Sequence, residues 1–435
     1  MGVMKIRPAA SVRGPVRVPG DKSISHRAAM IASLAEGRSR IENFADSEDC
    51  ASTLSCLSQL GVKVERDGDS VSIDGVGMTG FSQPTGPLDC GNSGTTMRLL
   101  AGILAAQPIK TKLTGDDSLR KRPMRRIIEP LTQMGAKIHA ADGRAPLNIE
   151  GGPLRGIEYE MPVASAQLKS CLLLAGLNAE GETAVIERVR TRDHSERVLR
   201  SFGVEVEERP FRGGRRISVA GGQTLKSQVF TVPGDVSSAA FFVAAAAALP
   251  GSMITIENLG LNPTRAALLD LVRLFGARIE VSDTREVCGE PVVDVTVRGG
   301  PEALETAKNG RVEGSTVANL IDEIPILAVL GTQLRGGLEI RDASELRVKE
   351  SDRIASVVEN LRRMGATVEE RPDGLRVETS ILYGCEVDSF GDHRIAMAFA
   401  VAGLLAKGET TIKGADCAAV SFPNFFEMLD SVAVR

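Results

Sequence analysis

The sequence predicts an α/β fold made of two similar domains, each built from three repeated units. Three observations support this prediction. A short phrase of the form apolar-x-x-apolar-Gly-(Val/Ala)-x-(Val/Ile)-(Glu/His) recurs along the chain. Six apolar segments alternate with that phrase, each opened by polar or glycine-rich residues. The tetrapeptide VPGD occurs at residues 18–21 and again at 232–235, about half a chain later.

The recurring phrase marks the end of a helix and the start of a strand. Its copies are LSQLGVKVE, LTQMGAKIH, LRSFGVEVE, VRLFGARIE and LRRMGATVE, which begin at residues 57, 131, 199, 272 and 361. A degenerate sixth copy, EMLDSVAVR, begins at residue 427 and lacks the glycine. The apolar spacing predicts a helix, the glycine tolerates the positive φ of a helix C-terminus, and the alternation after it predicts a strand.

The six apolar segments predict buried helices, because they are apolar on nearly all sides. They occupy residues 26–37, 97–108, 168–181, 238–251, 324–337 and 393–408. A β-rich stretch follows each, at residues 38–44, 109–115, 183–189, 253–259, 338–343 and 410–415. The chain therefore consists of six repeats of roughly seventy residues, three before Pro233 and three after it. A solenoid is the rival architecture, but the units are long and their polar openings are not simple repeats.

Length, charge and cysteine content indicate a two-domain protein that binds neither nucleic acid nor metal. A length of 435 residues favours two domains, and a net charge of -4 argues against nucleic acid as a partner. The seven cysteines form no CxxC pair and the four histidines show no metal-ligand spacing. We therefore expect free thiols, a cytoplasmic location and no metal. The most apolar run, residues 239–250, is too short to span a bilayer, and the N-terminus lacks the apolar stretch of a signal peptide.

Charged and hydroxylated residues gather at the predicted helix starts, where backbone N–H groups favour anions. GDKSISHR places Lys22, Ser23 and Arg27 at the first start, with Ser23 and Arg27 on one face. Further motifs are GNSGTTMR (91–98), LRKRPMRR (119–126), ASAQLKS (164–170), TRDHSER (191–197), DE (322–323), LRVKESDR (346–353) and GDHR (391–394). Taken singly, each also fits a cap, a turn or a solvated surface; Ser23, for example, fits an N-cap.

Together these motifs predict a cleft that binds small polyanions. Arginine side chains suit carboxylates and phosphates, and acids among them suit proton transfer. The cations are Lys22, Arg27, Arg122, Arg192, Lys349, Arg353 and Arg394, and the acids are Asp322 and Glu350. The chain has no GxSxG motif and no cysteine in these loops, so no covalent nucleophile is predicted. A scaffold that only binds polyanions is the non-enzymatic alternative, but it would have no need for the two acids.

The motifs together resemble the 5-enolpyruvylshikimate-3-phosphate (EPSP) synthase family over the whole chain. They are PGDKSISHR, GNSGTTMR, KRPM, SAQLK, RDHSE, LRVKESDR, DHRIAM and SFPNF. The resemblance implies two inside-out α/β domains, each of three βαβαββ units around buried helices. Residues 20–233 would form the shikimate 3-phosphate side, and residues 1–19 with 234–435 the side that clamps phosphoenolpyruvate.

The implied activity is transfer of the enolpyruvyl group of phosphoenolpyruvate to the 5-hydroxyl of shikimate 3-phosphate, with release of phosphate. This reaction belongs to chorismate and aromatic amino-acid biosynthesis and needs no cofactor. The implied partners are the two small substrates, without nucleic acid or membrane, and the expected state is a monomer.

The resemblance also implies residue roles. The hydroxyl adds to C2 of phosphoenolpyruvate while C3 is protonated; phosphate then leaves and C3 is deprotonated. Asp322 would be the base for the hydroxyl, and Glu350 the acid and base at C3, with Lys22 assisting. The implied shikimate 3-phosphate ligands are Lys22, Ser23, Arg27, Ser165, Ala166, Gln167, Arg192, Asp322 and Lys349. The implied phosphoenolpyruvate ligands are Lys22, Asn92, Gly94, Thr95, Arg122, Gln167, Arg353, His393 and Arg394.

Some features separate this chain from other members of the family. SAQLK and RDHSE resemble the class II subclass noted for tolerance to glyphosate, whereas Gly94 stands where the best-known tolerant members carry alanine. Leu99 replaces the proline of an MRP motif, and Val420 replaces a lysine expected to contact phosphoenolpyruvate. UDP-N-acetylglucosamine enolpyruvyl transferase is the main rival, but it uses a loop cysteine where this chain has LRKRPM. RNA 3′-phosphate cyclase is a more distant rival.

Overall fold

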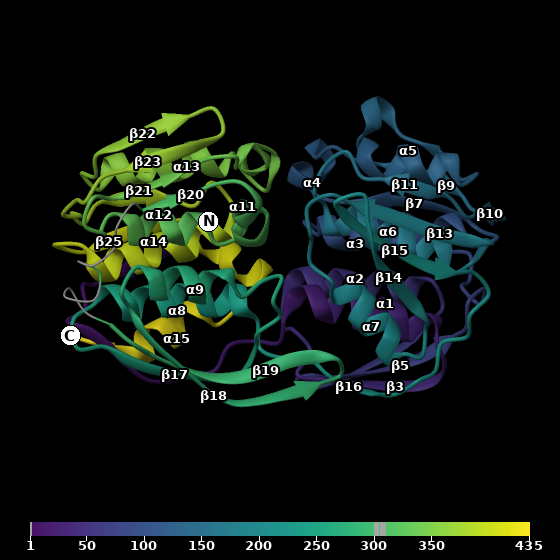
Figure 1. The fold of residues 1–435 in the computed structure, drawn as a ribbon, viewed down its shortest axis with the longest axis horizontal. Coiled ribbons are helices and arrows are strands. Elements are labelled where there is room, and N and C mark those ends of the chain that lie inside the picture. Colours follow the sequence, from purple (N-terminus) through teal and green to yellow (C-terminus); the bar gives the residue numbers. More distant parts are fainter. Residues whose placement is uncertain (1, 300–303, 305–309) are drawn as a thin grey trace. The chain divides into compact units, whose positions relative to one another are not determined.

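A computed structural model describes residues 2–299, 304 and 310–435 (Figure 1). Contacts within the chain divide it into two units. Unit 1 contains the residues up to Pro19, Pro233–Glu286 and Pro291–Arg435, and unit 2 contains Gly20–Val232 and Val287–Glu290. Both units are α/β, as the sequence predicted, and each is described by itself.

Three buried helices form the centre of each unit, so all six predicted helices are confirmed. In unit 2 they are α1 (Lys22–Leu34), α3 (Gly94–Ala105) and α6 (Ala166–Gly176). In unit 1 they are α8 (Val236–Ala248), α12 (Ile324–Gly331) and α14 (His393–Leu405). Four of the six begin before the apolar segment; α1, for example, begins at Lys22 because the polar opening forms its first turn. Nearly every residue of α8 and α14 is buried, which explains why neither has a polar face.

Six other helices carry the recurring phrase at their ends. They are α2 (Glu48–Gln59), α5 (Arg125–Gln133), α7 (His194–Ser201), α9 (Ala267–Leu274), α13 (Arg353–Arg363) and α15 (Phe425–Val432). The five phrase glycines all have positive φ, from +85° to +105°, as predicted. After α2, the Gly61 N–H donates to Ser58 and the Val62 N–H to Leu57, which is the Schellman arrangement of a helix C-terminus. The other four glycines follow the same pattern.

Unit 2 contains three four-stranded sheets and a two-stranded one. The sheet orders are β16-β3-β5-β4, β6-β7-β9-β8, β11-β13-β15-β14 and β10-β12. The strands of the first sheet are β3 (Glu36–Glu42), β4 (Lys63–Asp67), β5 (Ser70–Val76) and β16 (Val229–Thr231), and those of the second are β6 (Leu88–Asp89), β7 (Lys110–Thr114), β8 (Lys137–His139) and β9 (Leu147–Glu150). The remaining strands are β10 (Leu154–Arg155), β11 (Glu158–Glu160), β12 (Ala179–Glu180), β13 (Glu182–Glu187), β14 (Val206–Phe211) and β15 (Gly214–Ala220).

Unit 1 contains sheets of five, four and three strands among the described residues. Their orders are β18-β19-β17-β2-β26, β20-β21-β23-β22 and β1-β25-β24. The first sheet is formed by β2 (Ser11–Val16), β17 (Met253–Gly260), β18 (Arg278–Val287), β19 (Glu290–Arg298) and β26 (Ala433–Val434). The others are formed by β20 (Arg311–Val312), β21 (Leu338–Ile340), β22 (Val368–Arg371), β23 (Gly374–Val377), β1 (Val3–Ile6), β24 (Glu386–Asp388) and β25 (Thr410–Lys413). Two short helices, α4 (Asp117–Lys121) and α11 (Ser315–Leu320), and three 3₁₀ turns, η1 (Ala141–Gly143), η2 (Ser344–Val348) and η3 (Ala415–Val420), complete the described elements.

One pairing rule recurs in the sheets. The strand after a buried helix pairs in parallel with one neighbour and antiparallel with the second strand of a hairpin; β7, for example, lies between β6 and β9. The last repeat differs, because β25 pairs antiparallel with the N-terminal strand β1, and β26 pairs with β2. The degenerate sixth phrase therefore ends in a strand that joins another sheet.

The repeated VPGD lies where the chain changes unit. The strand before the first copy, β2, pairs with β17 in unit 1, while α1 after it belongs to unit 2. The strand before the second copy, β16, pairs with β3 in unit 2, while α8 after it belongs to unit 1. Asp21 and Asp235 cap the two helices, so both copies form the same strand–turn–helix junction.

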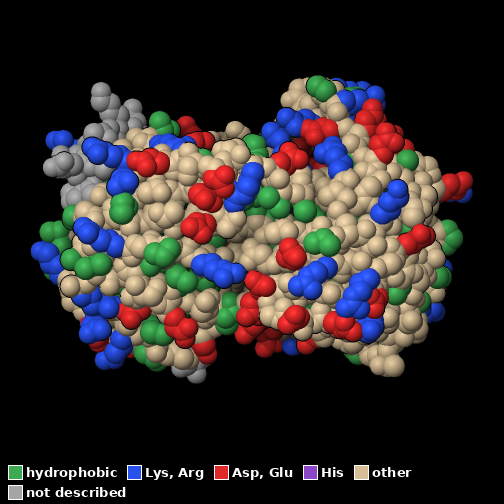
Figure 2. All heavy atoms as spheres, turned by 90° about the horizontal axis from the view of Figure 1, so that it is seen from below, with side chains coloured by type: hydrophobic (Ala, Val, Ile, Leu, Met, Phe, Trp, Pro, Cys, Tyr) green, Lys and Arg blue, Asp and Glu red, His purple; other side chains and the backbone are tan. Residues whose placement is uncertain are grey.

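Each unit has its own apolar core, formed by the buried helices and the inner faces of its sheets. Acidic and basic side chains are interspersed on the surface of each unit (Figure 2). Among the described residues, no helix is long and apolar enough to span a membrane.

Candidate active site

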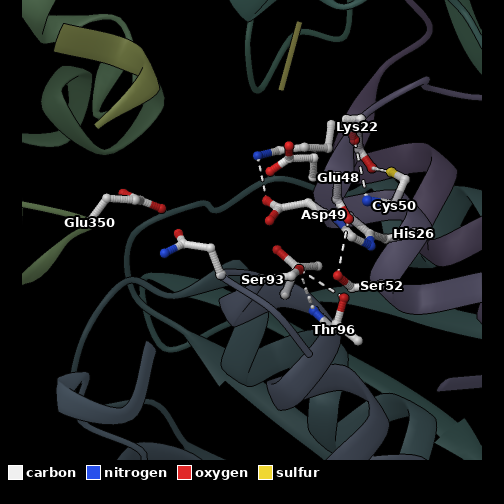
Figure 3. A network of polar contacts seen from close by, with 12 residues as sticks. Lys22, His26, Glu48, Asp49, Cys50, Ser52, Ser93, Thr96 and Glu350 are labelled. Atoms are coloured by element: carbon white, nitrogen blue, oxygen red, sulfur yellow. Dashed lines mark hydrogen bonds and ion pairs between the residues drawn. The ribbon is translucent and has the colours of Figure 1, made fainter. Parts of the chain in front are cut away.

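The start of α1 holds a lysine in an ion pair. Asp21 caps the helix, because its carboxylate accepts a hydrogen bond from the backbone N–H of Ile24 at 2.9 Å. Ser23 is therefore not the N-cap, and it lies with Lys22 in the half-buried first turn. The Lys22 ammonium lies 2.7 Å from a carboxylate oxygen of Asp49 on α2 (Figure 3). The pair fixes the ammonium beside N–H groups that attract anions.

A buried hydrogen-bond chain joins the helices α1, α2 and α3. Nδ1 of His26 lies 2.7 Å from the hydroxyl of Thr53, which lies 2.6 Å from that of Thr96. The Thr96 hydroxyl donates to Ser93 at 2.8 Å (Figure 3). Burial lowers the pKa of His26 well below its usual value, and the charges of Lys22 and Arg27 add to this shift. A neutral imidazole therefore connects α1 to α2 and α3.

The starts of α3 and α6 meet at Gln167. Its side-chain oxygen accepts a hydrogen bond from Arg98 at 2.6 Å, and its amide donates to the hydroxyl of Thr95 at 3.0 Å. Sequence reasoning predicted Gln167 and Thr95 but missed Arg98. The available signal was a single arginine within an otherwise apolar helix, because buried arginine needs partners.

Arg122 lies close to the same helix start. Its guanidinium donates to the side-chain oxygen of Asn92 at 2.7 Å. A Cβ on Gly94 would lie 2.8 Å from one guanidinium nitrogen of Arg98 and 3.4 Å from one of Arg122. The backbone at Gly94 is thus covered by two cationic groups, which favours a small anion there.

Arg27 is buried and is held by two serines from other helices. Its Nε donates to the hydroxyl of Ser195 at 2.7 Å, and a terminal nitrogen donates to that of Ser170 at 2.8 Å. The two hydroxyls lie 2.6 Å apart. A third donation reaches the backbone oxygen of Ser23 at 2.9 Å. Arg27 therefore ties α1 to α6 and to the first turn of α7.

The SAQLK and RDHSE motifs are joined by buried charges. Ser165 caps α6, and Ala166 is the first residue of that helix. The ammonium of Lys169 lies 2.6 Å from a carboxylate oxygen of Glu196 and 3.1 Å from one of Glu187, and all three side chains are buried. Burial opposes the charge of the lysine, but the two carboxylates outweigh burial and raise its pKa. The loop that carries Arg192 therefore has a fixed place beside α6.

In unit 1, Arg353 gathers three carboxylates. Its nitrogens lie 2.6 Å from Glu350, 2.8 Å from Asp392 and 3.3 Å from Asp322. Only 2% of the Arg353 side chain is exposed, against 18% for both Asp322 and Glu350. Burial opposes its charge, but Asp392, Glu350 and Asp322 outweigh burial and raise the pKa of Arg353. Lys349 adds a second cation 4.0 Å from Asp322.

The start of α14 is linked to this cluster by Asp392. Its carboxylate accepts from the backbone N–H of Arg394 at 2.9 Å, which makes it the N-cap of the helix. Both His393 and Arg394 are buried in the first turn. One guanidinium nitrogen of Arg394 lies 3.9 Å from Glu323, so the second carboxylate of the DE pair is also matched by a cation.

Many of the predicted residues lie in three clusters. In unit 2 the Gln167 cluster contains Gln167, Arg98, Thr95, Asn92, Gly94 and Arg122, and the Arg27 cluster contains Arg27, Ser23, Ser170 and Ser195. In unit 1 the Arg353 cluster contains Arg353, Asp322, Lys349, Glu350 and Asp392. The predicted residues in unit 2 are Lys22, Ser23, Arg27, Asn92, Gly94, Thr95, Arg122, Ser165, Ala166, Gln167 and Arg192; those in unit 1 are Asp322, Lys349, Glu350, Arg353, His393 and Arg394. Asp49 was missed from the sequence, whereas Arg98 and Asp392 lay in the motifs GNSGTTMR and GDHR but were given no role there. Within the described part of the chain, no group of three or more His, Cys, Asp and Glu side chains is arranged to hold a metal ion.

Known proteins resemble this chain along its whole length. Residues 6–429 match the family model of EPSP synthase (3-phosphoshikimate 1-carboxyvinyltransferase). The 3-phosphoshikimate 1-carboxyvinyltransferase of Koribacter versatilis is 52% identical, with 100% of both chains covered, and that of Solibacter usitatus is 51% identical, with 99% of both covered. The structure of EPSP synthase from Acinetobacter baumannii superimposes with a TM-score of 0.87 at 41% identity, covering 100% of this chain and 99% of that one. Fold, sequence and motifs agree, and the chain belongs to the EPSP synthase family.

Proposed function

We propose that the three clusters divide the EPSP synthase reaction between them. As a family member, the chain is a transferase of the shikimate pathway. It transfers the enolpyruvyl group of phosphoenolpyruvate to the 5-hydroxyl of shikimate 3-phosphate and releases phosphate. The C2–O bond to phosphate breaks, and a C2–O bond to the shikimate oxygen replaces it.

Shikimate 3-phosphate is assigned mainly to residues 20–233. The start of α6, capped by Ser165, presents backbone N–H groups of the kind that bind phosphate. Arg192 follows on the loop tied down by Lys169 and its two glutamates. The proposed ligands are Lys22, Ser23, Arg27, Ser165, Ala166, Gln167 and Arg192, together with Asp322 and Lys349 of residues 234–435.

Phosphoenolpyruvate is assigned to cations from both units. Arginine is suited to its carboxylate and phosphate because two parallel hydrogen bonds can form. Arg98, which contacts Gln167 and lies over Gly94, joins this set as an addition from the structure. The proposed ligands from the sequence are Lys22, Asn92, Gly94, Thr95, Arg122, Gln167, Arg353, His393 and Arg394.

The Arg353 cluster carries the proposal for the chemistry. One buried guanidinium contacts both Asp322 and Glu350, which brings two partly exposed carboxylates together. We assign Asp322 as the base that takes the proton of the 5-hydroxyl as its oxygen attacks C2. In the same step, protonated Glu350 gives its proton to C3, which yields a tetrahedral intermediate. Glu350 takes a proton back from C3 when phosphate leaves, with Lys22 stabilising the developing charge.

Phosphate release tests the function. The purified enzyme is expected to release phosphate from phosphoenolpyruvate with shikimate 3-phosphate, and to release none when UDP-N-acetylglucosamine replaces it. Release only with the UDP-sugar would favour the rival enolpyruvyl transferase. Release with neither, although both substrates bind, would favour a binding scaffold.

We further assign the chain to the class II subclass, to the cytoplasm and to a monomeric state. The subclass motifs SAQLK and RDHSE contact each other through the ion pair of Lys169 and Glu196, so the two motifs form one connected feature. All seven cysteines are free thiols, which suits a reducing compartment. Glyphosate inhibition measured against phosphoenolpyruvate tests the subclass, because SAQLK and RDHSE favour tolerance whereas Gly94 does not. Sedimentation velocity tests the monomer.

A further inference from the structure

A hairpin whose strands lie in the sheet of unit 1 has its tip in unit 2. Strands β18 and β19 pair in the five-stranded sheet, while Val287–Glu290 belong to unit 2 by their contacts. The Glu290 carboxylate lies 2.7 Å from Nδ1 of His194, and only 1% and 2% of these side chains are exposed. Because a carboxylate only accepts, His194 is the donor. This buried contact lies outside the three clusters described above.

Two further contacts hold the tip in place. The guanidinium of Arg197 donates to the backbone oxygen of Gly289 and lies 3.8 Å from the Glu290 carboxylate. The sulfur of Cys288 accepts a hydrogen bond from the backbone N–H of Thr231 at 3.4 Å. The Glu290 carboxylate therefore has a nearby cation, and the tip is attached by both backbone and side-chain groups.

His194 is the first residue of α7, and the next residue holds Arg27. The body of α7 is fixed by apolar packing, since Val198 and Leu199 are fully buried. Its first turn is different, because the buried residues there are polar: His194, Ser195 and Glu196. Hydrogen bonds are directional, so they decide where this turn lies. Glu290 supplies the bond to the first of these residues.

We propose that Glu290 is a positioning residue for shikimate 3-phosphate. By holding His194, it fixes the first turn of α7, and thereby the Ser195 hydroxyl that orients the Arg27 guanidinium. This inference rests on the proposed assignment of Arg27 and Arg192 to shikimate 3-phosphate. Glu290 itself touches neither substrate, and its effect reaches the reaction through α7.

The test compares Glu290→Ala, Glu290→Gln and Glu290→Asp in the full chain. In Glu290→Ala, a buried donor loses its acceptor, so we expect the KM for shikimate 3-phosphate to rise about tenfold. The KM for phosphoenolpyruvate should change less than about twofold, because the hydrogen bonds of Gln167 to Arg98 and Thr95 come from α3 and not from α7. Glu290→Gln keeps an acceptor at the same reach and should restore most of the loss. Glu286→Ala, at the exposed residue before the tip, is the matched control and should behave as wild type.

Glu290→Asp keeps a carboxylate near Arg197, but its side chain is one methylene shorter, so the carboxylate lies farther from His194. This variant replaces Glu290→Ala in the test if Glu290→Ala does not fold. It should show an intermediate rise in the same KM. An unchanged KM for shikimate 3-phosphate in a folded Glu290→Ala or Glu290→Asp variant would overturn the inference, as would equal changes in both KM values. Failure of the proposed function is a separate outcome, since the wild-type enzyme itself would then release no phosphate.

Discussion

Replacing Lys169 with methionine should destabilise unit 2 strongly. The lysine is the single ammonium in a buried triad with Glu187 and Glu196, so the triad carries one net negative charge. Methionine has nearly the same length and volume, so the change removes charge without opening a large cavity. Two carboxylates then lie buried beside each other without their cation.

The structure sets the size of this effect. The nitrogen–oxygen distances of 2.6 and 3.1 Å and the near-zero exposure of all three side chains make this a fully buried, hydrogen-bonded pair of contacts. Removing one partner of a buried ion pair lowers the free energy of unfolding by about 3–5 kcal/mol. Glu196→Gln should lower it by only about 1–2 kcal/mol, because one ammonium and one carboxylate remain balanced. The double variant should be more stable than the sum of both single losses predicts.

Urea unfolding followed by circular dichroism gives the order of stabilities, and hydrogen exchange of α6 peptides assigns the loss to unit 2. Lys169→Arg keeps a cation and is the control. The reasoning is refuted if Lys169→Met lowers the free energy of unfolding by less than about 1 kcal/mol, or if Glu196→Gln lowers it as much.

Three further predictions concern local features. The His26 imidazole has a lowered pKa in the folded state, so below about pH 6.5 the unfolded chain binds a proton that the folded chain does not bind. The free energy of unfolding should therefore fall by up to about 1.4 kcal/mol per pH unit as the pH is lowered. In His26→Asn, the urea midpoint should depend less on pH between pH 7 and 5. Equal slopes in both proteins would contradict this. Gly203→Ala should lower the free energy of unfolding by about 1–2 kcal/mol, because φ is +87° at this position. Gly86→Ala, at a glycine without positive φ, should leave the free energy of unfolding unchanged. Equal urea midpoints for the two variants would contradict the role of the positive φ. Burial raises the pKa of Cys50 to about 12, so iodoacetamide at pH 8 should modify it far more slowly than the half-buried Cys385, as read by mass spectrometry; equal rates would argue against the buried thiol.

Local sequence signals predicted the elements that depend on local physics. The buried helices were visible as apolar segments, because a helix such as α8 has no solvated face to interrupt the pattern. The phrase glycines were visible because a helix end with positive φ strongly favours glycine. Helix caps at Ser165 and Asp392 follow from the same short-range chemistry.

Contacts between distant segments were not predictable in this way. The edge strand β16 pairs with β3, although residues 229–231 and 40–42 lie far apart in sequence. Arg98 and Gln167 are separated by 69 positions, and Lys22 and Asp49 by 27, and neither pair has a spacing that marks it. The hairpin tip at Glu290 was missed for the same reason, because β18 and β19 look like an ordinary amphipathic hairpin. Tertiary packing alone brings these groups together.

Asp322 and Glu350, held by Arg353, are assigned the proton transfers of the reaction. The most direct measurement is the kcat for phosphate release by Asp322→Asn and Glu350→Gln at saturating substrates. Each change keeps the shape of the side chain but removes its acid–base function, so kcat should fall by about 10²–10⁴ with an unchanged circular dichroism spectrum. Glu359→Gln, at an exposed position on the same helix as Arg353, should retain full activity. If either catalytic variant kept nearly full kcat while folded, the assigned proton roles would be wrong.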